Sequence, residues 1–354
     1  MSKLFYIALF MPMMMFAAVK SDFYLWQRNQ NKPVQNAVQN FYKNSSGHLY
    51  FLAGEFENDG KIIPVKPAPV IDLQRSVPVF RIHIRHMKKT AALLADEIYR
   101  LYEPYSAAKA LQIDLDAPES KIDYYTNLML ELRKKLPDTK LSATVLPCHL
   151  KHTKKFTQLA KACDFYVLQV HGLAKESGNW SIYDHKTAQK ALAKAEKIGL
   201  PFKAALPLYC NILSQNLLVK PDLYKVAELA SKCREIIVFR LGYPGDGQSL
   251  DMKTAENICN GKYAPEIKFK WHRQNKNLRY LSIENCGFFS EKVTLQLEYD
   301  KEFVADMDTF NYAFLNGSRL SVILPPSGTC KNFLWVRTKN KQNLANIIKI
   351  KEVK

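Results

Sequence analysis

The chain has 354 residues, of which 47% are hydrophobic and 24% are charged. This composition excludes disordered, collagen-like and disulfide-dense chains, and the length favours one large domain with a small one. The 51 Lys and Arg residues exceed the 33 Asp and Glu residues, and the resulting charge of +18 suits an anionic partner. The only long apolar run lies at the N-terminus, which excludes a polytopic membrane protein.

The first twenty residues have the pattern of an export signal. A short basic start at Met1–Lys3 is followed by the apolar run Leu4–Val19 and then by polar sequence. The run has the length of a signal peptide and is short for a membrane span. We therefore expect residues 1–20 to be a signal peptide or an uncleaved anchor, and the protein to lie in the periplasm or to be secreted. A buried N-terminal segment is the alternative.

Residues 21–262 alternate between short β-rich stretches and amphipathic helical stretches. The predicted strands start 23 to 38 residues apart, which is the size of a βα unit. Eight units predict a (β/α)8 TIM-like barrel, with an open eight-stranded sheet as the alternative. The predicted strands are Phe23–Trp26, His48–Phe56, Val79–Arg85, Ala110–Asp116, Leu141–Pro147, Asp164–His171, Phe202–Tyr209 and Glu235–Tyr243.

The helical patterns between these strands include Lys88–Tyr102, Ile122–Leu136, Phe156–Cys163, Thr187–Ile198, Asp222–Cys233 and Met252–Cys259. The stretch Asn58–Ser76, rich in Pro and Gly, has no clear helix. After Gly261 the helical period disappears, and residues 263–354 predict a small antiparallel β-sandwich domain with a basic tail. Its predicted strands are Lys268–Trp271, Leu278–Ile283, Lys292–Tyr299, Leu320–Leu324 and Phe333–Arg337. Capping the barrel is the favoured role of this domain, and carbohydrate binding is the alternative.

Strand alternation predicts which side chains meet inside the barrel. In Leu111–Asp116 the apolar residues share the face toward the helices, so Gln112, Asp114 and Asp116 point inward. Asp116 is nearest the carboxyl-end mouth, where barrel chemistry is built. The same reasoning directs further polar groups to the lumen or its mouth: Glu55, Arg81, His83, Gln169, His171 and Arg240.

Burying so many ionisable groups costs several kcal/mol each unless they are paired. Two arrangements stay open. Either Arg81 or Arg240 pairs with Asp114 in a salt-bridge plug, or the polar groups line a wet cleft for a polar ligand. Trp26, Trp180 and Tyr209 lie near the same end and could stack on sugar rings.

The seven cysteines are scattered, with no zinc-ligand spacing, and we expect neither a metal site nor a cofactor. Most are read as small buried hydrophobes, although Cys286 and Cys330 could form a bridge within the β-domain.

Several ordered stretches together resemble an uncharacterised bacterial family, domain of unknown function 3142. They include Leu111–Pro118, Leu141–Pro147, Val167–Gly172 and Ala205–Tyr209. The resemblance spans residues 22 to 245 and implies an exported protein with a glycosidase-like TIM barrel.

A more limited resemblance is to the chitinase superfamily of glycoside hydrolases, whose fourth strand carries D-x-x-D-x-D-x-E. Asp114 and Asp116 match the two aspartates that precede the catalytic glutamate, but Pro118 stands at the place of that glutamate. Glu119 is one residue out of register and would point the other way on a continuing strand.

These observations favour an extracytoplasmic glycoside-hydrolase-like protein acting on a polysaccharide or cell-wall glycan, and the charge of +18 favours an anionic one. Glycosidic cleavage needs a protonated carboxylic acid and a second, ionised carboxylate. We predict Asp116 as one of them, Glu55 or Glu119 as its partner, and Asp114 as the neighbour that raises its pKa. The predicted substrate-binding residues are Trp26, Arg81, His83, Gln169, His171, Trp180, Tyr209 and Arg240.

A non-catalytic barrel that binds glycan is the second hypothesis, because the chitinase glutamate is missing. Nucleic acid is not an expected partner, since the lysine runs lie on predicted helices and no nucleic-acid-binding motif is present. Contact with a membrane is expected only through an uncleaved N-terminal segment.

Overall fold

The structure is a computed structural model that describes residues 21–176, 179–212, 218–263, 267–285, 291–310, 313–324, 329–339 and 348–352. The expected signal or anchor at residues 1–20 and Cys286 of the suggested bridge lie outside these residues. Within the described part, no helix combines the length and the apolar character needed to cross a membrane.

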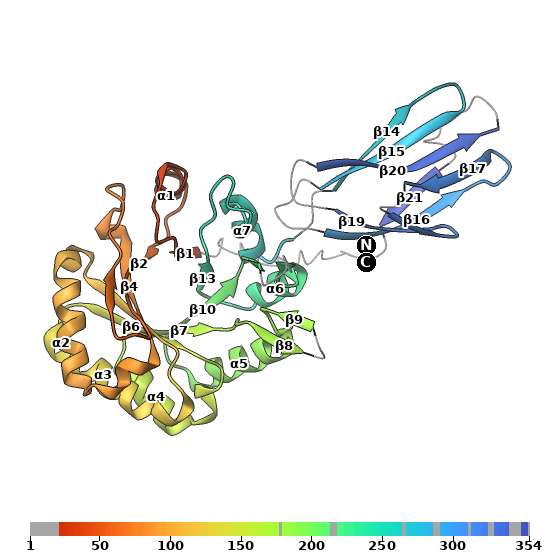
Figure 1. The fold of residues 1–354 in the computed structure, drawn as a ribbon. Coiled ribbons are helices and arrows are strands. Elements are labelled where there is room, and N and C mark those ends of the chain that lie inside the picture. The colour runs from red at the N-terminus through yellow and green to blue at the C-terminus, as the bar shows by residue number, and fades with distance from the viewer. Residues whose placement is uncertain are drawn as a thin grey trace, which may run out of the picture.

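Eight parallel strands form a closed barrel (Figure 1). Strand β1 pairs with β2 on one side and with β13 on the other, so the sheet closes on itself. The predicted barrel is confirmed, and the open sheet is excluded. The barrel strands are β1 Ser21–Leu25, β2 Leu49–Phe56, β4 Ser76–Ile82, β5 Ala110–Leu115, β6 Lys140–Val145, β7 Phe165–Gln169, β10 Phe202–Pro207 and β13 Ile236–Phe239.

Helices follow the strands and surround the barrel. Several begin at a side chain that accepts a backbone N–H, as Asn31, Thr90 and Asp251 do. The α-helices are α1 Lys32–Asn44, α2 Ala91–Tyr102, α3 Ile122–Lys135, α4 Thr153–Lys161, α5 His185–Ile198, α6 Leu223–Ala230 and α7 Met252–Cys259. The 3-10 turns are η1 Leu73–Arg75, η2 Ile84–Lys88, η3 Glu103–Ala108, η4 Glu119–Lys121 and η5 His149–Lys151.

Shorter strands complete this part of the chain. Strand β3 (Ile62–Pro64) and η1 connect β2 to β4 in place of an α-helix, as the Pro- and Gly-rich sequence there predicts. Two small hairpins follow β7 and β10. They consist of β8 Ala174–Glu176 with β9 Asn179–Ser181, and β11 Asn211–Ile212 with β12 Leu218–Val219.

The barrel strands bury two separate apolar layers. Leu111, Ile113 and Leu115 of β5 belong to the larger layer, between the strands and the helices, as alternation predicts. A smaller cluster fills the barrel interior and includes Tyr24 and Tyr50, with aliphatic side chains from the other strands. Because this middle layer is packed, a ligand can reach the interior only from the carboxyl-end mouth.

The C-terminal region forms two antiparallel four-stranded sheets, which confirms the predicted β-class. One has the order β14 Ile267–Arg273, β15 Leu278–Asn285, β20 Thr329–Thr338 and β17 Val304–Thr309. The other has the order β18 Ala313–Asn316, β19 Arg319–Leu324, β16 Glu291–Tyr299 and β21 Ile348–Glu352. Residues Ile348–Glu352 of the expected basic tail form β21, which pairs with β16. Its alternating Ile and Lys residues suit a strand with one buried face.

Candidate functional site

A cavity of about 500 Å³ opens at the carboxyl ends of the barrel strands. We call it the mouth cavity. Eight of the twelve site residues predicted from the sequence line it, and they come from β1, β4, β5, β7, β10 and β13 or the loops that follow. These eight are Trp26, Arg81, Asp114, Asp116, Gln169, His171, Tyr209 and Arg240.

Asp114 and Asp116 bring two like charges into this cavity from one edge of β5. Asp114 is half-buried, whereas Asp116 follows the last strand residue and is exposed at the mouth. Burial and the neighbouring charge of Asp116 raise the pKa of Asp114 to about 7, against the weaker effects of Thr144 and Arg81. Burial also raises the pKa of Asp116, although Arg81 and His149 oppose the rise. The pair therefore keeps a proton at pH values where an ordinary aspartate is ionised.

Glu55 is held in an ion-pair network beside the mouth cavity. It is buried on β2, where its carboxylate accepts hydrogen bonds from Arg28 at 2.5 and 2.7 Å and from Arg81 at 3.0 Å. Burial raises the pKa of Glu55, but these hydrogen bonds outweigh it and leave the pKa below its ordinary value. Glu55 is thus an ionised carboxylate whose charge is already matched by two guanidinium groups.

The register between β2 and β4 places Arg81 next to Glu55. Glu55 lies opposite Arg81 across the β2–β4 pair, after a β-bulge between Leu52 and Gly54. The bulge sets which β2 side chains face inward, and it brings the carboxylate to the arginine.

Aromatic rings form one wall of the mouth cavity. Phe239 lies between Trp26 and Tyr209, with ring centroids 5.4 and 5.0 Å away. If Arg240 pointed inward on a regular strand, as expected, Phe239 would face the helices; instead Phe239 packs against the interior cluster. Because β13 ends at Phe239, Arg240 lies past the regular alternation and still lines the cavity. The peptide bond between the two residues is cis.

Arg240 is fixed by partners in the loop after β13. Its guanidinium donates hydrogen bonds to Asp246 at 2.7 Å, Ser249 at 3.0 Å and Gln248 at 3.4 Å. Arg81 and Arg240 therefore bind Glu55 and Asp246, and within the described residues neither forms an ion pair with Asp114. Of the two arrangements left open by the sequence, the cavity matches the wet cleft and not the plug.

His171 and Gln169 project from the end of β7. Burial lowers the pKa of His171 to about 3, so the ring is neutral at physiological pH. Its Nδ1 lies 3.4 Å from the Tyr209 hydroxyl, while its Nε2 has no hydrogen-bond partner among the described residues. The side-chain amide nitrogen of Gln169 donates a hydrogen bond to the backbone carbonyl of His171 at 3.1 Å, so the side-chain oxygen of Gln169 can accept a hydrogen bond from a ligand. This side of the cavity offers neutral hydrogen-bonding groups.

The remaining predicted site residues lie elsewhere. Glu119 is held in η4 by His152 at 2.7 Å and Lys151 at 3.3 Å and does not line the mouth cavity. His83 was expected to point inward, but β4 ends at Ile82. His83 instead caps η2 by accepting the Arg85 amide, and it is exposed. Trp180 is exposed on β9, and it too is absent from the lining of the mouth cavity.

Two polar interactions inside the barrel were not predicted from the sequence. His149 is fully buried, accepts the Leu146 amide at Nδ1 and donates from Nε2 to the Ala117 carbonyl at 2.6 Å. It therefore joins the loop after β6 to the loop that carries Asp116, and its loop position gave no periodic signal. At the opposite end, Lys203 and the buried Asp22 form an ion pair at 2.6 Å. Strand alternation could have found Lys203, which shares the face of Tyr209.

No group of three His, Cys, Asp or Glu side chains within the described residues is placed to hold a metal ion. The chemistry available at the mouth is that of the aspartate pair, the arginines and the aromatic rings.

The model of a family described as "Domain of unknown function (DUF3142)" matches residues 77–220. This segment contains both aspartates, Arg81, Gln169, His171 and Tyr209, so the family resemblance is confirmed over the central part of the barrel. No curated protein matches the sequence.

A class V chitinase from Pseudomonas fluorescens Pf-5 is similar in structure, with a TM-score of 0.50 and 10% sequence identity. The alignment covers 69% of this chain and 99% of that protein. The catalytic domain of a chitinase from Pyrococcus furiosus aligns with a TM-score of 0.43 and 12% identity, over 63% and 84% of the two chains. The xylanase and α-amylase inhibitor protein XAIP-II from Scadoxus multiflorus aligns with a TM-score of 0.44 and 12% identity, over 70% and 100%. At such low identity the similarity to the class V chitinase establishes the fold alone, a TIM barrel.

Proposed function

We propose that the mouth cavity binds a glycan chain and that the Asp114–Asp116 pair donates the proton that cleaves a glycosidic bond. The observation that carries this proposal is the position of the pair. Two coupled carboxyl groups, one with a pKa raised to about 7, open into a cavity with an aromatic wall. A proton donor with a pKa near the working pH is what general acid catalysis requires.

The other lining residues suit a sugar ring. Trp26 and Tyr209 present flat apolar surfaces, and a sugar ring has an apolar face that can stack on such a surface. Arg81, Gln169 and His171 offer donors and acceptors for hydroxyl groups on the ring edge. The lining of the cavity is mainly polar, with three aromatic side chains among it, and this mixture suits a ligand rich in hydroxyl groups.

In the proposed reaction Asp116, the more exposed member of the pair, gives its proton to the glycosidic oxygen. The bond between that oxygen and the anomeric carbon breaks, and the leaving sugar departs as an alcohol. Water then adds its oxygen to the anomeric carbon and returns a proton to the aspartate pair. Asp114, as the buried neighbour, keeps the pKa of the pair high enough for this exchange.

A specific observation favours a second function, glycan binding without cleavage. Two carboxyl groups on opposite sides of the scissile bond are usual in glycoside hydrolases. Glu55 is matched by Arg28 and Arg81, and Glu119 is held away by His152 and Lys151. Asp114 and Asp116 come from the same strand, so neither faces the other across a substrate.

Hydrolysis of a polysaccharide panel, measured as reducing ends, separates the two functions. Asp116→Asn should reduce the rate by about 100-fold or more while glycan binding, measured by calorimetry, is retained. Asp123→Asn is the matched control, since this exposed carboxylate pairs with Lys155 outside the cavity. Product release by Asp116→Asn at the wild-type rate would exclude Asp116 as the donor. If the wild type and Asp116→Asn bind glycan equally and neither releases product, the protein binds glycan without cleaving it.

We also propose that the protein acts outside the cytoplasm, as a polysaccharide substrate requires. The basic start and apolar run of residues 1–20 support this proposal. Cell fractionation checks it, and recovery of the protein in the cytoplasmic fraction would reject it.

A further inference from the structure

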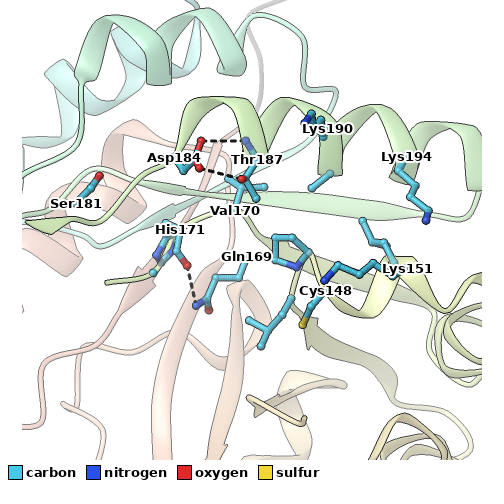
Figure 2. Close-up of a pocket in the computed structure, with 15 residues that line it drawn as sticks. Cys148, Lys151, Gln169, Val170, His171, Ser181, Asp184, Thr187, Lys190 and Lys194 are labelled. Atoms are coloured by element: carbon cyan, nitrogen blue, oxygen red, sulfur yellow. Dashed lines mark hydrogen bonds between the residues drawn. The ribbon is translucent and has the colours of Figure 1, made fainter. Parts of the chain in front are cut away.

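We infer that a second cavity, which adjoins the mouth cavity, binds the acidic sugars of a uronic-acid polysaccharide. This inference rests on the proposed glycan function and adds the chemical class of the chain. The second cavity has a volume of about 740 Å³ and lies along α5 (Figure 2). We call it the α5 groove. It shares Gln169, His171 and Gly172 with the mouth cavity, so a chain bound at the mouth can continue into it.

The groove is walled by an apolar surface with lysines above it. Leu146, Pro147 and Leu150 line one side, and Val170 and Ala191 line the base and the α5 side. Such a surface accommodates the apolar faces of sugar rings and gives no site for a free inorganic ion.

Three lysines and one aspartate are the ionisable groups of the groove, apart from the neutral His171 and the thiol of Cys148. Lys190 and Lys194 lie one turn apart on the same face of α5, about 6 Å along the helix axis. Neither forms an ion pair with a carboxylate within the described part of the chain. Lys151 lies on the facing wall, as Figure 2 shows, and it already binds the Glu119 carboxylate at 3.3 Å. Among the described residues, the unpaired positive charge of the groove therefore lies on its α5 wall, at Lys190 and Lys194.

The one acidic group, Asp184, is occupied as the N-cap of α5. The Asp184 carboxylate accepts hydrogen bonds from the backbone N–H and the hydroxyl of Thr187, both at 3.0 Å. The hydrogen bond from this backbone N–H lowers the pKa of Asp184. This cap also closes the helix N-terminus, which is where a phosphate would otherwise bind. The lining contains no arginine, the residue best suited to bidentate anion recognition. The lysine ammonium groups can each attract one carboxylate, and the apolar wall can contact the sugar rings that carry those carboxylates.

The test compares binding of polygalacturonate with binding of a neutral glucan oligosaccharide of equal length, in 150 mM NaCl. The full chain and two double variants are used. Lys190→Ala/Lys194→Ala removes the groove charges, while Lys186→Ala/Lys197→Ala removes two charges from the same helix outside the groove lining. If each groove lysine contributes as a partly exposed ion pair, the first variant should bind polygalacturonate about tenfold more weakly. The second should bind within about twofold of the wild type.

The outcomes separate this inference from the proposed function. Equal weakening by both double variants would show attraction by overall charge and would overturn the inference. Neutral glycan cleavage with no preference for polygalacturonate would also overturn it and leave the proposed function intact. Lysine-dependent binding of polygalacturonate without Asp116-dependent cleavage would support the groove and reject the hydrolase. Failure of both glycans to bind would reject both proposals.

Discussion

At the scale of single residues, the ionisation of the mouth is decided by neighbours. Asp114 and Glu55 are both carboxyl groups withdrawn from water, yet their pKa values move in opposite directions. Glu55 gains two guanidinium partners, whose hydrogen bonds outweigh burial. Asp114 gains a second carboxylate, which adds to burial. A fixed anion, Glu55, thus lies beside the mouth cavity, while Asp114 in the cavity lining is a carboxyl group that can carry a proton.

Asp114→Asn tests this difference through stability. In the folded protein the pKa of Asp114 is about 7, against an ordinary value of 3.8, so the folded state binds the proton more tightly. The stability of the wild type should therefore fall as pH rises from about 4 to about 7. Asparagine does not ionise, so the variant does not lose stability over this range. Between pH 5 and pH 8 its free energy of unfolding should therefore rise, relative to that of the wild type, by on the order of 1–2 kcal/mol.

Urea unfolding at both pH values measures the effect. Asp116→Asn serves as a companion, because removing the like charge should lower the pKa of Asp114 and flatten the same pH dependence. A stability difference between wild type and Asp114→Asn that does not change with pH would contradict a raised pKa.

Residue positions were predictable from the sequence wherever a strand continued regularly. Asp114 and Gln169, which lie within β5 and β7, line the mouth cavity as alternation predicts. The prediction that His83 points inward failed because β4 ends at Ile82, one residue before it. The prediction that Glu119 belongs to the site failed because a 3-10 turn begins at Glu119. At strand ends the backbone leaves the extended conformation, and the period of two no longer sets the direction of a side chain.

At the scale of elements, the loops after β5 and β6 are joined by one side chain. His149 in η5 accepts a hydrogen bond from the Leu146 amide and donates one to the Ala117 carbonyl, and these two groups belong to different loops. Such a loop-to-loop contact depends on tertiary packing and has no local pattern, so the sequence could not indicate it. The eight strand positions, by contrast, followed from local apolar runs, with errors of a few residues at the ends.

His149→Ala should cost about 2–4 kcal/mol at pH 7, because it leaves a cavity and two unpaired backbone groups. Burial lowers the pKa of His149, so the folded state favours the neutral ring. The wild type should then lose this stabilisation as pH falls through about 6.5, and the difference between the proteins should shrink at pH 5. His152→Ala is the matched control three residues away, since its exposed pair with Glu119 is worth less than about 1 kcal/mol.

Thermal or urea unfolding at pH 7 and pH 5 gives both differences. Equal losses for His149→Ala and His152→Ala would show that the buried ring does not join the two loops.

At the scale of the whole molecule, closure of the barrel is a long-range event. Strand β1 pairs with β13, more than two hundred residues away, and this pairing converges the mouth residues on one cavity. The number of βα units predicted closure, but no local pattern identifies the partner of an edge strand. In the C-terminal sheets the short strands β17 and β18 and the terminal β21 were missed. In β17 only Val304 is buried, and in β18 the apolar Phe314 is exposed, so neither strand shows a clear apolar face.

The described residues form separate apolar cores, one set in the barrel and one between the C-terminal sheets. Because no buried residue belongs to both, we predict that the two regions unfold in separate transitions, resolved by calorimetry of the full chain. Leu132→Ala in α3 should destabilise the barrel by about 2–5 kcal/mol and lower only its transition temperature. Leu334→Ala in β20 should act in the same way on the C-terminal transition alone. A single transition that both substitutions shift together would mean that the barrel and the C-terminal sheets fold as one cooperative unit, and the predicted boundary near residue 262 would then have no energetic meaning.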